Sequence, residues 1–285
     1  MLKKIKNYFD IFKRRPYWFT RLVLSRILLI SGLSRLFMIR LGDVKLRFFP
    51  TRFSADLWFP AKNIFKDYNL PFLKEGNTVI DVGANIGLTV LLFKKYIGST
   101  GNIYAFEPDP KGFEYLKKNI KLNKLNNVFL FNCAVGEKKE KAYLKINEKA
   151  STGNAITFSK KEGILVDMVC LDNFTEEYCI DVVDLLKVDT EGFEKFVFLG
   201  GKETLSKTNF VIFEAIPNNC KRYDYHIKEI IYLLEQMNFH IFCCKKDSSV
   251  FEKINVEHYL GSKGEYLYDL FAVKDSSLIK NVKWC

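Results

Sequence analysis

From residue 78 to residue 273 the chain alternates short apolar runs with longer amphipathic segments, and this alternation restricts its fold more than any other feature. Short runs that are apolar throughout are typical of strands buried on both faces, whereas the amphipathic segments have the period of a helix. A helix between successive strands allows those strands to lie parallel. We therefore predict a doubly wound, mostly parallel α/β sheet of the Rossmann-like kind. The predicted strands are residues 79–81, 103–107, 128–132, 183–188, 211–214, 240–244 and 267–273, and the predicted helices are residues 88–96, 111–123, 194–205 and 226–236.

The first 52 residues hold the whole net charge of +11. They contain 13 Lys and Arg residues against Asp10 and Asp43, whereas the rest of the chain carries 31 basic and 31 acidic residues. The charge therefore belongs to a terminal segment and not to the body of the protein. We expect a basic N-terminal extension at residues 1–73 and the α/β domain at residues 74–285. Within the extension, the pattern predicts a helix over residues 1–35 and a hairpin over residues 37–49.

Residues 17–41 are apolar, but arginines interrupt them at positions 21, 26, 35 and 40. The longest uncharged run, residues 27–34, has 8 residues, whereas a membrane-spanning helix needs about 20. A membrane span is therefore not expected. Two interpretations stay open: a helical extension packed on the domain, or contact of residues 1–41 with an anionic membrane surface.

The seven cysteines are scattered, form no C-x-x-C pair and accompany only three histidines. This distribution does not favour a disulfide framework or a structural zinc site. It fits the reducing cytoplasm, where thiols remain free. We expect a cytoplasmic protein, with the inner face of the membrane as a second location if the basic extension contacts lipid.

The loop after the first predicted strand, residues 81–87, favours a positively charged ligand over a dinucleotide. Ligands of doubly wound sheets bind beyond the carboxyl ends of the strands. There the chain has Asp81, Gly83 and Gly87 in a D-x-G-x-x-x-G pattern, which differs from the G-x-G-x-x-G cradle for a dinucleotide pyrophosphate. An acid at this position suits a positively charged ligand, such as a methionyl amino group. Glu107 ends the next strand, where a carboxylate can accept both ribose hydroxyls.

These features together favour S-adenosylmethionine over NAD as the cofactor. The alternative is that the two glycines only form a tight turn and that Glu107 caps the following helix. An acid between Phe106 and Pro108 has no role in a hydrophobic core, which favours the cofactor interpretation.

Eight segments of the chain, in order and with matching spacing, resemble the FkbM-type methyltransferases, a family of S-adenosylmethionine-dependent O-methyltransferases. The resemblance covers about half of the chain, and the first 60 residues and the C-terminal tail lie outside it. The segments are VIDVGANIG (79–87), FEPDP (106–110), NIKLNKLNNV (119–128), NCAVG (132–136), STGNAI (151–156), CLDNF (170–174), LLKVDTEGFE (185–194) and IFEAIP (212–217).

This resemblance implies a seven-stranded methyltransferase sheet whose last hairpin is reversed. It also implies that Glu107 holds the ribose, that Cys133 and Ala134 lie near the adenine, and that Phe106 and Pro108 flank the base. The residues implied to lie against the methionyl part are Gly83, Ala84, Asn85 and Gly87.

Three acidic residues follow the fourth and fifth predicted strands and are the candidates for catalysis: Asp189, Glu191 and Glu214. A weakly acidic hydroxyl must lose its proton during methyl transfer. One carboxylate with a raised pKa can act as a general base, or two or three carboxylates can hold Mg²⁺, which would acidify the hydroxyl. The alternative is that Asp189 caps the next helix, and for Glu194 such a structural role is preferred. The polar turn at 151–154, in a predicted β excursion over 142–172, is expected either to fold over the acceptor or to form an exposed hairpin.

The leading hypothesis is an O-methyltransferase that acts on a hydroxyl, with the sugar of a glycan or glycolipid suggested by family resemblance and another small molecule as an alternative acceptor. The [N/D]-P-P-[F/Y] motif of amino-group methyltransferases is absent from the sequence, which favours oxygen as the acceptor atom. A second hypothesis is a nucleic-acid-binding or -modifying protein with residues 3–26 as a phosphate track, but the neutral body makes it less favoured. An NAD-linked oxidoreductase lacks its phosphate-binding motif here.

Overall fold

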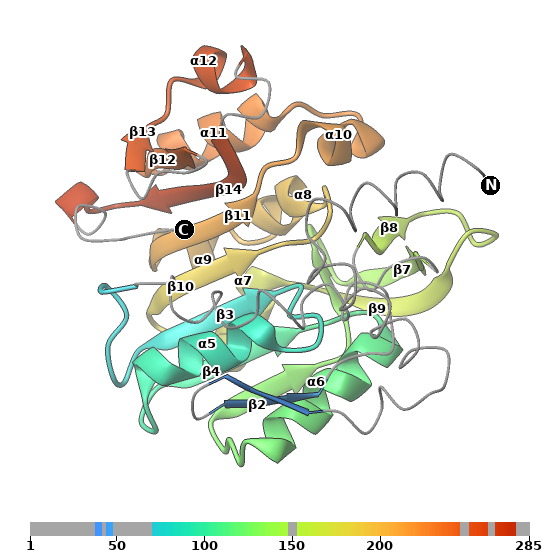
Figure 1. Cartoon of the computed structure of the whole chain (residues 1–285). Helices are drawn as coiled ribbons and strands as arrows, with labels where there is room; N and C mark the ends of the chain where they lie inside the picture. Colours follow the sequence, from blue (N-terminus) through green and yellow to red (C-terminus); the bar gives the residue numbers. More distant parts are fainter. Residues whose placement is uncertain are drawn as a thin grey trace, which may run out of the picture.

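The computed structural model of the chain describes residues 38–41, 44–47, 70–147, 153–245, 251–261 and 266–277. Its centre is an eight-stranded sheet of order β13-β12-β14-β11-β10-β3-β4-β5 (Figure 1). Adjacent strands from β11 to β5 are parallel, whereas β14 is antiparallel to both β11 and β12, and β13 is antiparallel to β12. The strands are β3 (Thr78–Val82), β4 (Asn102–Phe106), β5 (Val128–Phe131), β10 (Val183–Val188), β11 (Thr208–Glu214), β12 (His240–Lys245), β13 (Phe251–Lys253) and β14 (Tyr266–Val273).

Helices cover both faces of this sheet, which is why its central strands are apolar on both sides. In β3, Val79 packs with the helices α5 and α6, while Ile80 packs into the opposite core together with α7, α8, α9, α11 and α12. Alternate residues of a strand point to opposite faces, so a buried strand between two helix layers contains no regular polar position. The helices are α5 (Leu88–Ile97), α6 (Pro110–Leu122), α7 (Leu171–Glu177), α8 (Glu194–Leu199), α9 (Lys202–Ser206), α10 (Pro217–Cys220), α11 (Ile227–Gln236) and α12 (Val256–Gly261).

A second, four-stranded sheet lies between β5 and β10 in the sequence and packs beside the main sheet (Figure 1). Its order is β6-β9-β7-β8, and it has a small core of its own that includes Leu144, Ile156 and Met168. Phe193, which follows β10, completes this core and so joins the two sheets. The strands are β6 (Ala134–Gly136), β7 (Glu140–Lys145), β8 (Ala155–Thr157) and β9 (Ile164–Cys170). The predicted β excursion is therefore present as a complete small sheet.

The hairpin predicted in the N-terminal region is present as β1 (Met38–Leu41) and β2 (Val44–Arg47). It is attached to the domain: Asn123, at the end of α6, accepts a hydrogen bond from the backbone N–H of Lys45 at 2.7 Å and donates one to its carbonyl at 2.6 Å. Leu46 is fully buried in the core beneath α5 and α6. The predicted helix over 1–35 lies outside the described residues. Within the described ranges, no helix has the length and apolarity needed to cross a membrane.

The doubly wound α/β class is confirmed, with two departures in detail. The sheet has eight strands instead of seven, because the short β13 adds an antiparallel edge next to β12. The helix predicted over 194–205 is two helices, because Gly200 and Gly201 separate α8 from α9. A side chain at Gly200 would meet the carbonyl oxygen of Gly136 at 2.2 Å, so this break lets the backbone pass close to β6.

Candidate active site

A cavity of about 370 Å³ opens at the carboxyl ends of β3, β4, β10 and β11, and residues of the small sheet close its other side. Its size is within the usual range of small-molecule sites, about 300–1,000 Å³. The cavity brings together residues of both predicted groups, the cofactor-binding group and the catalytic group. Those that line it are Gly83, Asn85, Glu107, Pro108, Cys133, Ala134, Asp189, Glu191 and Glu214.

The loop after β3, which contains Gly83 and Gly87, lies close to neighbouring backbone. Gly83 has a φ of +85°, and a Cβ atom there would lie 1.8 Å from the carbonyl oxygen of Asp189. The backbone N–H groups of Gly83 and Ala84 both donate to the carbonyl of Phe106, at 3.0 and 2.9 Å. Gly87 has a φ of +90° at the start of α5. Only glycine adopts this conformation without strain, so both predicted glycines have a clear backbone role.

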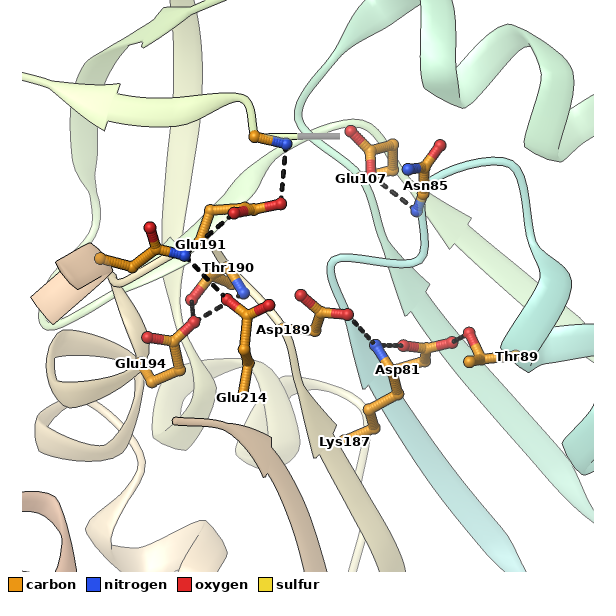
Figure 2. A network of polar contacts seen from close by, with 12 residues as sticks. Asp81, Asn85, Thr89, Glu107, Lys187, Asp189, Thr190, Glu191, Glu194 and Glu214 are labelled. Atoms are coloured by element: carbon orange, nitrogen blue, oxygen red, sulfur yellow. Dashed lines mark hydrogen bonds and ion pairs between the residues drawn. The ribbon is translucent and has the colours of Figure 1, made fainter. Parts of the chain in front are cut away.

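Glu107 is held in an orientation that suits two hydroxyl ligands. Its Oε2 accepts a hydrogen bond from the backbone N–H of Asn85 at 2.7 Å (Figure 2), and its Oε1 accepts one from that of Asp109 at 2.8 Å. Each carboxylate oxygen has a second lone pair. Burial raises the pKa of Glu107 to about 7, although the two backbone N–H groups oppose this shift. The arrangement fits the ribose-binding role that the sequence predicts.

Asp81 is fully buried and faces a protein cation (Figure 2). Its Oδ2 accepts a hydrogen bond from Thr89 at 2.5 Å, and its Oδ1 lies 3.5 Å from the Nζ of Lys187. Lys187 also donates to Asp189 at 3.2 Å. Burial by itself would lower the pKa of Lys187, but the surrounding carboxylates of Asp189, Asp81 and Asp269 raise it above its ordinary value.

The sequence prediction gave Asp81 a cationic ligand as its partner, and the structure gives it Lys187. Ala84 and Gly87 are likewise buried, and none of these three predicted cofactor residues is among the described residues that line the cavity. Lys187 was not predicted. Its signal was a charged residue inside the apolar run of β10, where a side chain can be buried only if it is paired.

The three predicted catalytic carboxylates lie on the side of the cavity opposite Glu107 (Figure 2). Glu191 accepts hydrogen bonds from the backbone N–H of Gly153 at 2.7 Å and from the Asn219 amide at 3.1 Å. The same amide group donates to Glu214 at 3.2 Å, so Asn219 bridges the two glutamates. Burial, and then the negative charges of Asp189, Glu191 and Glu194, raise the pKa of Glu214 to about 9.

A buried glutamate fixes the loop that carries two of these residues. Glu194 accepts hydrogen bonds from the backbone N–H of Thr190 at 2.8 Å, from its hydroxyl at 2.9 Å and from the N–H of Gly192 at 3.1 Å. Its side chain is 1% exposed, and burial raises its pKa to about 7. The structural role that the sequence favoured for Glu194 therefore agrees with its contacts.

The charge of the cavity is one-sided. Among the described residues that line it, four are carboxylates, namely Glu107, Asp189, Glu191 and Glu214, and none is basic. Such a lining favours cationic or neutral ligands and disfavours phosphate groups. In the described part of the chain, no group of three or more His, Cys, Asp or Glu side chains is arranged to hold a metal ion.

The family comparison identifies the class of protein as the methyltransferases that use S-adenosylmethionine. Residues 81–241 match the family model described as the methyltransferase FkbM domain. The chain therefore belongs to the FkbM methyltransferase family, as the sequence motifs predicted.

Relatives in other organisms carry methyltransferase names. The chain is 30% identical to Methyltransferase 1 of Beauveria bassiana over 166 residues, which cover 50% of this chain and 66% of that protein. It is 25% identical to the 2-O-methyltransferase NoeI of Sinorhizobium fredii over 158 residues, which cover 50% of this chain and 64% of that protein. The chain thus spans slightly less than two thirds of the length of these relatives.

One solved structure with a similar arrangement is the methyltransferase FkbM of Methylobacillus flagellatus. The two chains share 13% sequence identity with a TM-score of 0.46, and the match covers 88% of this chain and 59% of that one. Membership of the family therefore rests on the family model and not on this similarity.

Proposed function

We propose that this protein is an S-adenosylmethionine-dependent O-methyltransferase that modifies a hydroxyl of an uncharged acceptor, a sugar of a glycan or glycolipid. The observation that carries this proposal is the cavity itself. On one side Glu107 offers two carboxylate oxygens that can accept hydrogen bonds from the ribose hydroxyls. On the opposite side lies a group of carboxylates.

The residues of the cavity fit this cofactor in size and charge. S-adenosylmethionine supplies an electrophilic methyl group on a positively charged sulfonium. The four carboxylates favour that positive charge, and an open volume of about 370 Å³ accommodates a ligand of this kind. Pro108, Cys133 and Ala134 provide an apolar surface against which a base can lie. These contacts support the assignment of Glu107 to the ribose and of the other wall to the acceptor.

Glu214 is the strongest candidate for the group that takes the hydroxyl proton. Burial and its acidic neighbours raise the pKa of Glu214 to about 9 in the ligand-free protein, so its side chain holds a proton at neutral pH. A bound sulfonium would lower this pKa toward the working pH, where a base is most effective. Asn219 holds this carboxylate beside Glu191, which restricts its orientation. Asp189 stands at the same wall and accepts from Lys187.

A metal ion held by Asp189, Glu191 and Glu214 is a different route to the same proton transfer. Carboxylate oxygens are the ligands that Mg²⁺ prefers. However, in the described part of the chain these carboxylates are not arranged as a group that could hold a metal ion, and the Asn219 amide already bridges Glu191 and Glu214. The side chains as arranged do not fit a metal ion well, so we assign no step to one.

The choice of oxygen as the acceptor atom has support from a relative: the protein of Sinorhizobium fredii is named a 2-O-methyltransferase. The absence of basic side chains among the described lining residues agrees with an uncharged hydroxyl and disfavours a nucleic-acid substrate.

The cofactor assignment can be tested by calorimetric titration of the full-length protein with S-adenosylmethionine and, separately, with NAD. We expect micromolar binding of S-adenosylmethionine alone, and a loss of at least tenfold in affinity for Glu107→Ala. Binding of NAD, or of neither ligand by a folded protein, would overturn the assignment. With a bound cofactor, Glu214→Gln is expected to keep its affinity and to lose methyl transfer, measured by mass spectrometry of the acceptor with and without Mg²⁺.

We also propose that the basic N-terminal segment brings the enzyme to the cytoplasmic face of a membrane, where lipid-linked glycans are accessible. The support is the confinement of the net charge of +11 to residues 1–52. Anionic lipid attracts clustered Lys and Arg with about 1 kcal/mol per residue near the surface.

A further inference from the structure

A second hollow adjoins the cavity and is not required for binding the cofactor. It has a volume of about 590 Å³ and lies between the small sheet and the turn η2 (Lys221–Tyr223), which follows α10. Gly153 and Ile156 line both hollows, so the two share a wall. We call this second hollow the outer groove. Its lining also includes Lys145, Phe158, Glu162, Arg222 and Tyr223.

Two aromatic rings in the outer groove are connected to the cavity through Phe193. Phe158 is 65% exposed, and its ring centroid is 6.5 Å from that of Phe193, a residue of the cavity lining. Tyr223 packs edge-on against Phe193 at 5.2 Å and donates a hydrogen bond from its hydroxyl to the carbonyl of Ile156 at 2.9 Å. Tyr223 is therefore fixed, whereas the ring of Phe158 presents a large uncovered apolar surface next to the site.

The charged groups of the outer groove are largely committed within the protein. Lys145 and Glu162 form an ion pair at 2.8 Å and so balance each other. Arg222 donates one hydrogen bond from Nη1 to the backbone carbonyl of Glu191 at 2.9 Å. An arginine has five N–H donors, so its guanidinium retains capacity for a ligand. Glu191 itself lines the cavity, and Arg222 thus stands where the two hollows meet.

We propose that the outer groove binds the acceptor, and that the acceptor is an uncharged oligosaccharide whose rings extend over Phe158 while the hydroxyl to be methylated enters the cavity. This inference rests on the proposed function. The C–H groups on one face of a pyranose ring are partly positive and pack on the negative face of an aromatic ring. The remaining donors of Arg222 can bind sugar hydroxyls.

Charge favours this class of acceptor over an anionic polymer. A polyanion lying in the outer groove would have to place its reacting end beside Asp189 and Glu191. Like charges in a partly buried site disfavour such binding. A neutral sugar has no such cost, and its hydroxyls can hydrogen-bond to the same carboxylates.

The test uses the full-length protein saturated with S-adenosylhomocysteine, applied to an array of uncharged bacterial and plant oligosaccharides. We expect the wild-type protein to bind a subset of these glycans and Phe158→Ala to bind the same glycans at least tenfold more weakly. Leu165→Ala is the matched control, because Leu165 is 56% exposed on β9 of the same sheet but is not among the described residues of the outer groove. Absence of glycan binding by the wild-type protein would overturn the proposal, and so would equal binding by Phe158→Ala.

Two further measurements separate this proposal from the proposed function. Calorimetry with S-adenosylmethionine should give the same affinity for Phe158→Ala and the wild-type protein, because Phe158 is not a lining residue of the cavity. Each captured glycan is then incubated with the enzyme and S-adenosylmethionine and examined by mass spectrometry. A bound glycan that gains no methyl group would contradict the proposed function, while the outer groove would still be a glycan-binding site. If Phe158→Ala methylates the glycan with the same KM for the glycan as the wild-type protein, the outer groove is not the acceptor site, and the proposed function still stands.

Discussion

Two effects disfavour a side chain at position 83: the positive φ of Gly83 and the closeness of the Asp189 carbonyl. A control variant can separate them. We expect Gly83→Ala to destabilise the protein by about 3–5 kcal/mol, because the new Cβ meets the carbonyl oxygen of Asp189 at 1.8 Å in addition to the strain of a positive φ. Gly76→Ala is the control: its φ of +89° is similar, but its nearest neighbour is 3.8 Å away. It should cost about 1–2 kcal/mol. Equal losses for the two variants in urea denaturation would show that the contact with Asp189 is unimportant.

Glu214 should make the ligand-free protein less stable as the pH rises. Its pKa in the folded state, about 9, is above its ordinary value of 4.5. Between these values the folded state binds more protons than the unfolded state, so the free energy of unfolding falls with rising pH. We therefore expect Glu214→Gln to match the wild-type protein near pH 4.5 and to exceed its stability progressively above that pH, by up to about 1.4 kcal/mol for each pH unit. Denaturation between pH 5 and 8 measures this difference.

The control for this pH dependence is Glu235→Gln, which changes an exposed glutamate on α11. Its stability relative to the wild-type protein should stay constant over the same pH interval. A constant difference for Glu214→Gln as well would mean that Glu214 is not protonated in the folded protein at neutral pH.

At the scale of the elements, one charge pair links β3 to β10. Lys187 and Asp81 are partners in the register of the two parallel strands and lie on the same face. Within the described residues, Asp81 Oδ1 has no hydrogen-bond donor and depends on Lys187 for compensation. Removing one partner of a buried ion pair typically costs about 3–5 kcal/mol, so Lys187→Met should lose stability of that order.

A second substitution tests whether this loss comes from the pair. Asp81→Asn keeps an oxygen for the hydroxyl of Thr89 and removes the buried charge. We expect the double variant Lys187→Met/Asp81→Asn to recover most of the stability that Lys187→Met loses. A double-mutant cycle by urea denaturation gives the coupling free energy. Simple additivity of the two single variants would rule out the pairing as the cause.

The sequence predicted these elements well wherever local pattern determines them. The apolar runs of β3, β4 and β10 and the carboxylate at the end of β4 follow from short stretches of chain. The position of Glu191 depends instead on the N–H of Gly153, 38 residues earlier, and on the amide of Asn219, 28 residues later. Such contacts form when segments distant in the sequence pack together, so no local sequence pattern predicts them.

The same holds for Lys187, the protein partner of Asp81, which was not predicted: their pairing is set by the register of β3 with β10. The short β13 could not be foreseen either, because its three residues are too few to show a period.

For the whole molecule, the uneven distribution of charge predicts salt-dependent membrane binding. We expect the full-length protein to float with vesicles that contain anionic lipid at low salt and to dissociate as the salt concentration rises. Deletion of residues 1–35, which hold nine Lys and Arg residues against Asp10, should strongly reduce flotation, because it removes +8 of the net charge of +11. Vesicles of uncharged lipid are the control. Unchanged flotation after the deletion would exclude the N-terminal segment as the anchor.

The lining of the cavity comes from parts of the chain that belong to two different sheets. Glu107 and Asn85 belong to the main sheet, whereas Leu144 and Ile156 belong to the four-stranded insertion, which has its own small core. Substitutions at the tips of the insertion can therefore change the edge of the cavity without moving the strand ends that carry Glu107, Glu191 and Glu214. For the function proposed above, this arrangement is suited to diversification, because the donor site can stay constant while the insertion changes to admit other acceptors.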